Sequence, residues 1–186
     1  MDKTTLPTSI TIKDIECKFN ADFRNILYVF QALNDPDLLD SEKIGVALYL
    51  FYDDENYSVD VETAIKEMFS FITMSENEPE NSSSSKPLFD WEQDYNLIIA
   101  PINKALGYDV RGVEYLHWWT FLSAFMEIGE CTFSTYVSIR NKLNKGKKLE
   151  KYEKDIMKEH RNSVILKKKY DSTTQSLMDE IMGYGG

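Results

Sequence analysis

The large apolar residues of this chain recur three and four positions apart, and this spacing confines most of the chain to packed helices. The densest example is residues 114–130, EYLHWWTFLSAFMEIGE, in which one apolar stripe would run along one side of a helix. The stripe consists of Tyr115, Trp118, Trp119, Leu122, Phe125 and Met126. Because such stripes are usually buried, we interpret this one as part of a core, with His117 at its border and Gly129 ending the helix.

Four other segments have the same spacing and predict four more helices. Their apolar faces are Phe23, Ile26, Leu27, Phe30 and Leu33; Ile44, Ala47, Leu48 and Phe51; Val61, Ile65, Met68 and Ile72; and Trp91, Tyr95, Ile98, Ile102 and Leu106. Asn20 or Asp22 can cap the first of these helices. The apolar content of 42% is sufficient for one packed core. We expect the structural core to include Phe23, Trp91, Tyr95, Trp118, Trp119, Leu122 and Phe125.

Two segments depart from the helical spacing. Residues 9–20, SITIKDIECKFN, alternate apolar and polar residues on both sides of Lys13-Asp14, which predicts a short β-hairpin. Residues 75–87, SENEPENSSSSKP, have no large apolar side chain and predict a flexible loop. Strands and helices do not alternate along the chain, which argues against a doubly wound nucleotide-binding fold.

Charge divides the chain into two parts. Residues 1–139 carry 9 Lys and Arg against 24 Asp and Glu, whereas residues 140–186 carry 12 against 7. We therefore predict an acidic helical body over residues 1–140 and a basic helical extension over residues 141–186. Together these observations predict a mainly α protein: a helical bundle with a short N-terminal β-hairpin and a protruding C-terminal helix.

The apolar stripe of the extension is too thin for a globular core, which favours contact with a partner. After Gly146, the segment KKLEKYEKDIMKEHRNSVILKKKY predicts one long charged helix, and SLMDEIMGYGG predicts a short amphipathic turn near the C-terminus. The residues that we expect to bind a partner are Leu149, Tyr152, Ile156, Leu177, Met178, Ile181 and Met182.

The sequence has little that points to catalysis or to a cofactor. Asp90 and Asp94 share a helix face, but acidic residues are expected at a helix N-terminus, where they oppose the macrodipole. The two cysteines and two histidines lie in four separate segments, which argues against a metal site or a disulfide framework. Neither a phosphate-binding glycine loop nor a nucleophile elbow occurs. We expect a protein that is not an enzyme and has no catalytic, cofactor-binding or metal-binding residues.

Membranes and nucleic acids are also unfavoured partners. The apolar runs are far shorter than the roughly 20 residues that span a bilayer, and no signal-peptide pattern opens the chain, so we expect a soluble cytoplasmic protein. An acidic body repels both phosphate backbones and anionic membrane surfaces, so nucleic-acid binding would depend on the basic extension.

Three stretches resemble one protein family. They are ITIKDIECKFNADFR, with Asp22, Phe23 and Arg24; LFDWEQDYNLIIAPINKALGYDV; and LHWWTFLSAFMEIGECTFSTYVSIRN, which opens at Leu116 and reaches Ile139-Arg140. In order and content they are similar to tailed-phage proteins named after gene product fifteen, which occur in the tail modules of siphophages and prophages. The resemblance covers residues 10–155. It departs at Lys13-Asp14, where the family usually has a glycine-containing turn, and it does not extend beyond Lys167.

The resemblance implies a function in phage tail assembly. Members of this family are encoded between the tail tube protein and the tape measure protein, where siphophages place tail assembly chaperones. It therefore implies a non-enzymatic tail-morphogenesis protein in the bacterial host cytoplasm, with no cofactor, which engages the tape measure protein. Binding to other tail proteins and homo-oligomerisation both remain open. The alternative is a nucleic-acid-binding phage regulator that uses the basic C-terminal helix.

Overall fold

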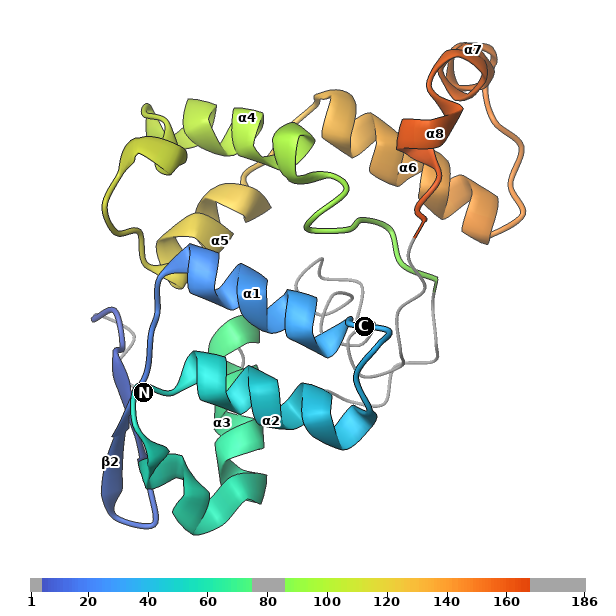
Figure 1. Ribbon diagram of the computed structural model, residues 1–186. Coiled ribbons are helices and arrows are strands. Elements are labelled where there is room, and N and C mark those ends of the chain that lie inside the picture. Colours follow the sequence, from blue (N-terminus) through green and yellow to red (C-terminus); the bar gives the residue numbers. More distant parts are fainter. Residues whose placement is uncertain (1–4, 75–85, 168–186) are drawn as a thin grey trace.

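Helices pack in several directions around one aromatic core, with a β-hairpin at one edge (Figure 1). The computed structural model describes residues 5–74 and 86–167 of the 186-residue chain. In chain order its elements are β1 (Ser9–Ile12), β2 (Ile15–Lys18), α1 (Phe23–Leu33), α2 (Asp40–Phe51), η1 (Glu55–Asp60), α3 (Val61–Thr73), α4 (Tyr95–Leu106), η2 (Val110–Gly112), α5 (Trp118–Met126), α6 (Thr132–Asn144), α7 (Lys151–Glu159) and α8 (Arg161–Val164). The predicted mainly α architecture with an N-terminal β-hairpin is confirmed. Most of the predicted loop at 75–87, and the partner-binding residues Leu177, Met178, Ile181 and Met182, lie outside the described residues.

The hairpin closes on a two-residue turn without glycine. Ile12 pairs with Ile15, and the two residues between them, Lys13 and Asp14, have φ angles of 46° and 65°. This left-handed pair is the type I′ turn, whose twist matches that of two antiparallel strands. Nζ of Lys13 lies 3.0 Å from a carboxylate oxygen of Asp60, at the start of α3, so the turn is also held to the body.

Helices α1, α2 and α3 form one half of the core. Asp22 caps α1 by accepting a hydrogen bond from the backbone N–H of Arg24, and α1 packs beside α2 (Figure 1). The apolar face predicted for α3 was wrong at its first residue: Val61 is exposed, and the buried face is centred on Ala64, Met68, Phe71 and Ile72. Val61 is exposed because α3 begins at the outer end of the bundle, directly after the η1 turn.

Helix α5 lies between α4 and α1, but its limits differ from those predicted (Figure 1). It begins at Trp118 and ends at Met126, before Gly129. Tyr115 and Met126 are more than half exposed, while Phe121 and Ala124 are buried instead. The helix starts late because Leu116 and the backbone N–H of Trp118 are hydrogen-bonded to residues 21–23, which holds residues 116 and 117 outside the helix. Helix α4 likewise starts at Tyr95, four residues after Trp91, because residues 90–94 form a separate turn.

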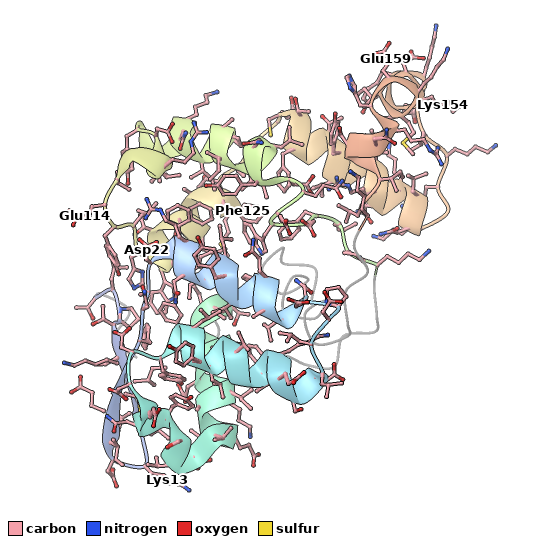
Figure 2. All side chains as sticks on the ribbon, viewed as in Figure 1. Lys13, Asp22, Glu114, Phe125, Lys154 and Glu159 are labelled. Carbon is pink, nitrogen blue, oxygen red and sulfur yellow. The ribbon has the colours of Figure 1, made fainter. Side chains whose placement is uncertain are left out.

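The long charged helix predicted after Gly146 is instead two short helices. Helix α7 ends at Glu159, and α8 follows as a single turn after a change of direction at His160. The break lets Val164 become fully buried against α6. Lys154 and Glu159 on α7 lie at the outer corner of the molecule, whereas Phe125 lies in its interior (Figure 2). Among the helices of the described ranges, none is both long and apolar enough to cross a membrane.

Candidate functional site

The adjacent tryptophans of α5 hold the end of α3. The indole Nε1–H of Trp118 donates to the carbonyl of Ile72, and that of Trp119 donates to the carbonyl of Phe71, both at 2.8 Å. The last carbonyls of a helix have no partner within the helix, so two consecutive donors satisfy two consecutive acceptors. Trp118 is fully buried and Trp119 is half-buried. The two tryptophans therefore have a structural role: they join α5 to the end of α3.

His117 is the N-cap of α5, and both of its ring nitrogens are used. Nδ1 accepts from the backbone N–H of Trp119 at 3.1 Å, and Nε2 lies 2.9 Å from the carbonyl oxygen of Pro7. A carbonyl can only accept, so the proton is on Nε2. Burial lowers the pKa of His117, which keeps the ring neutral. This arrangement leaves no ring nitrogen for catalysis.

The DWEQD turn is built around a buried ion pair. Asp90 accepts from the backbone N–H groups of Glu92 and Gln93, and Asp94 accepts from the N–H of Asp90 at 3.0 Å. The guanidinium of Arg140, on α6, meets the carboxylate of Asp94 with two hydrogen bonds of 2.6 and 2.9 Å. The two acids that share a helix face in the sequence thus have separate structural tasks.

Arg140 also fixes two segments far from it in sequence. It donates to the carbonyls of Leu88, Ser163 and Val164 at 3.0, 3.0 and 2.6 Å. With the two bonds to Asp94, all five donors of the guanidinium are used. The charge of the chain changes sign at this residue, in the middle of α6, so part of the basic segment is bound to the acidic part through a buried arginine.

Two of the three predicted partner-binding residues that the structure describes pack inward. Leu149 and Ile156 lie partly buried against a second apolar cluster formed by Tyr136, Ile139 and Val164. Tyr152, by contrast, is 59% exposed. The carboxylate of Glu153 is buried and receives the ammonium group of Lys142 at 2.8 Å, which lowers the pKa of Glu153 and holds α7 against α6.

A pocket of about 400 Å³ lies between α1 and the start of α4. We call it the α1–α4 pocket. It is lined by Arg24, Leu27, Tyr28, Phe30, Gln31 and Asn34 from α1 and its C-cap, by Asp90, Trp91 and Glu92 from the turn, and by Tyr95 and Asn96 from α4. Phe30 and Trp91 are buried, and Tyr28 is 56% exposed. Its size is that of ordinary ligand-binding pockets, and apolar walls with a few polar groups are typical of them.

Two residues that line this pocket each have a buried polar atom without a hydrogen-bond partner in the described structure: Nε1 of Trp91 and Oδ1 of Asn34. The other amide atom of Asn34, Nδ2, donates to the carbonyl of Phe30 at 2.9 Å, which fixes the orientation of the side chain. Unpaired buried polar atoms are costly and therefore uncommon. One free donor and one free acceptor are complementary to a peptide backbone, which offers one of each per residue.

The chemistry of the pocket suits binding of an apolar peptide segment. In the ranges that the structure describes, no cluster of three or more His, Cys, Asp or Glu side chains could hold a metal ion. Arg24, at one end of the pocket, is held by the carboxylate of Asp22 and by the carbonyls of Val110 and Val113. The rest of the lining combines aromatic and aliphatic side chains with the polar side chains of Gln31, Glu92 and Asn96.

This pocket was not predicted from the sequence, although two of its residues were named as core residues. Trp91 and Tyr95, predicted as core residues, form one wall of the pocket; Phe23, Trp118, Leu122 and Phe125 are buried elsewhere in the core. Tyr28 and Asn34 were not predicted as site residues. Tyr28 gave a weak signal, because it is a large aromatic residue one position outside the apolar stripe of α1, next to Leu27.

The comparisons with known proteins agree with the motifs that this structure brings together. The model of a family described as Bacteriophage Gp15 protein matches residues 3–166. Searches of the curated proteins and of the solved structures gave no significant match. The matched range includes the hairpin, the DWEQD turn, the tandem tryptophans and Arg140. Because the family model covers most of its length, this chain is a bacteriophage protein and belongs to the Gp15 family.

Proposed function

We propose that this protein is a non-enzymatic tail assembly chaperone, which binds apolar segments of the tape measure protein in the host cytoplasm. The observation that carries the proposal is the α1–α4 pocket, with its aromatic walls and its unpaired donor and acceptor. A chaperone that tube subunits later replace needs contacts that can be exchanged. A pocket that takes one or two side chains gives binding of that kind.

Family membership supports the same proposal. The chain belongs to a phage family, and the members that it resembles are encoded next to the tape measure gene. Tape measure proteins are long and helical, with apolar stripes that favour self-association. An amphipathic helix can insert one or two apolar side chains into such a pocket while its polar face stays in water.

Three exposed tyrosines allow a matched test of the binding surface. Tyr28 lies at the rim of the pocket and is 56% exposed; Tyr49, on the outer side of α2, is 76% exposed; and Tyr152, on α7, is 59% exposed. Each can be replaced by arginine with little effect on folding, because surface changes usually alter stability by less than about 0.5 kcal/mol. Each variant is then co-expressed with the neighbouring tape measure gene, and the amount of soluble complex is measured by affinity capture.

The proposal expects Tyr28→Arg to lose at least about tenfold in tape measure binding, since a charge at the rim must lose its water when the client binds. Tyr49→Arg should bind like the parent. Tyr152→Arg tests the part of the basic extension that remains exposed. Equal binding by all four proteins would refute the pocket as the client site.

The same purified proteins distinguish the chaperone from the alternative function, that of a nucleic-acid-binding regulator. A phosphate-binding surface depends on lysines, and its affinity falls steeply between low and physiological salt. Tight binding of the purified protein to DNA or RNA at physiological salt, unaffected by Tyr28→Arg, would favour the regulator instead.

A further inference from the structure

The described chain ends beside the α1–α4 pocket. Gln93, whose neighbours Trp91 and Glu92 line the pocket, holds the last described residues through three hydrogen bonds. Its Nε2 donates to the carbonyls of Ser163 and Ile165 at 3.2 and 3.0 Å, and its Oε1 accepts from the backbone N–H of Lys167 at 3.0 Å. Residues 168–186 therefore start from a fixed point next to the pocket.

The remaining residues are long enough and apolar enough to enter it. Leu177, Met178, Ile181 and Met182 have helical spacing, with Ser176 before them as an N-cap and Gly183 after them. The ten residues from Lys167 to Leu177 span up to about 33 Å when extended, far more than is needed to reach the neighbouring pocket. The backbone of such a segment also offers N–H and carbonyl groups, which complement Oδ1 of Asn34 and Nε1 of Trp91.

We propose that residues 176–183 of the same chain occupy the α1–α4 pocket when no client is bound, and that the client displaces them. This inference rests on the proposed function, because it assigns a resident ligand to the same pocket. The segment covers the apolar walls and pairs the two free polar atoms, so the unoccupied chaperone exposes less apolar surface to other copies.

The tether makes the segment an effective but replaceable competitor. For a link of this length, the effective concentration of the segment at the pocket is on the order of 1 mM. A segment that binds the pocket with a dissociation constant of about 0.1 mM would then occupy it most of the time. It would weaken client binding by roughly tenfold, the ratio of these two concentrations.

The indole N–H signals of the full-length protein test the occupancy directly by ¹H–¹⁵N NMR. Trp118 and Trp119 are internal controls, since their N–H groups are already bonded to the carbonyls of α3, and Trp91→Phe identifies the third signal. The test variant is Leu177→Asp with Ile181→Asp. Its matched control is Thr173→Asp with Gln175→Asp, which adds the same charge outside the apolar spacing.

We expect the test variant to shift the Trp91 signal alone, and the control variant to leave all three signals in place. A synthetic peptide of residues 172–184, added to the test variant, should restore the Trp91 signal to its original position. The test variant should also bind the tape measure protein about tenfold more tightly than the parent. An unchanged Trp91 signal in the test variant overturns the inference.

The failure of this inference can be told apart from failure of the proposed function. If Tyr28→Arg abolishes client binding while the test variant leaves the Trp91 signal unchanged, the chaperone function stands and the resident segment does not. If the segment is displaced in the test variant but Tyr28→Arg binds the client normally, the client site is elsewhere.

Discussion

Replacing Arg140 by methionine tests the buried ion pair most directly. The side chains of Arg140 and Asp94 are 4% and 1% exposed. Methionine keeps an unbranched apolar stem but removes all five donors. The carboxylate of Asp94 then stays buried without a counter-charge, and the carbonyls of Leu88, Ser163 and Val164 lose their donor.

The expected loss is large. Breaking a buried ion pair from one side costs about 3–5 kcal/mol, because the remaining charge is not compensated. Each buried carbonyl left unpaired adds up to about 1–3 kcal/mol, less where water can enter. We therefore expect Arg140→Met to lower the free energy of unfolding by at least about 4 kcal/mol, from a total that is typically about 5–15 kcal/mol. Urea unfolding, followed by far-ultraviolet circular dichroism, measures this difference.

A second substitution isolates the charge. In the Arg140→Met background, Asp94→Asn removes the unpaired charge, and the amide oxygen can still accept the hydrogen bond from the N–H of Asp90. The double variant should therefore be more stable than Arg140→Met alone, by about 2 kcal/mol, which is a coupling of the size seen within buried networks. A loss below about 1 kcal/mol for the single variant, or a double variant less stable than the single one, would refute this account of the pair.

Three further substitutions test other parts of the fold. Trp118→Phe removes the donor to the buried carbonyl of Ile72 and should cost about 1–3 kcal/mol, whereas Trp119→Phe should cost less because its half-buried site admits water; chemical unfolding that ranks them in the opposite order would contradict this. Asp14→Gly should raise the stability by about 0.5–1 kcal/mol, since a positive φ favours glycine; a lower melting temperature would contradict the turn geometry. Burial lowers the pKa of His117, so below pH about 6.5 the unfolded chain takes up a proton that the folded protein does not, and the contribution of the neutral ring is lost as the pH falls. His117→Asn keeps an N-cap acceptor and does not titrate. The melting temperature of this variant should therefore fall less than that of the parent between pH 7.5 and 5.5. Equal falls would show that His117 does not cause the loss of stability at low pH.

Periodicity predicted the elements better than it predicted their ends. The helical faces of α1 and α2 follow directly from spacing, because both helices pack along one side. The start of α5 depends instead on hydrogen bonds that join Leu116 and Trp118 to residues 21–23, which no local pattern reveals.

Contacts between distant segments were the main reason for the remaining errors. No local pattern connects Asp94 with Arg140, which lie 46 residues apart, or predicts a break of the charged helix at His160. Both follow from one requirement: a buried arginine needs five acceptors, and the turn of α8 provides two of them. The pocket was missed for the same reason, since its walls come from α1 and from the DWEQD turn, far apart in the chain.

The bonds that join residues 21–23 to residues 116–118 also affect how the chain can fold during its synthesis. Asp22 accepts from the backbone N–H of Leu116, 94 residues later. At about 5–20 residues per second, the ribosome needs roughly 5–20 s to synthesise the chain from Asp22 to Leu116. During that time the start of α1 lacks this hydrogen-bond partner. The carbonyls at the end of α3 likewise lack their indole donors until the two tryptophans have been synthesised. The N-terminal half therefore emerges with part of its apolar face uncovered, and that face is covered only when residues 116–119 have been synthesised.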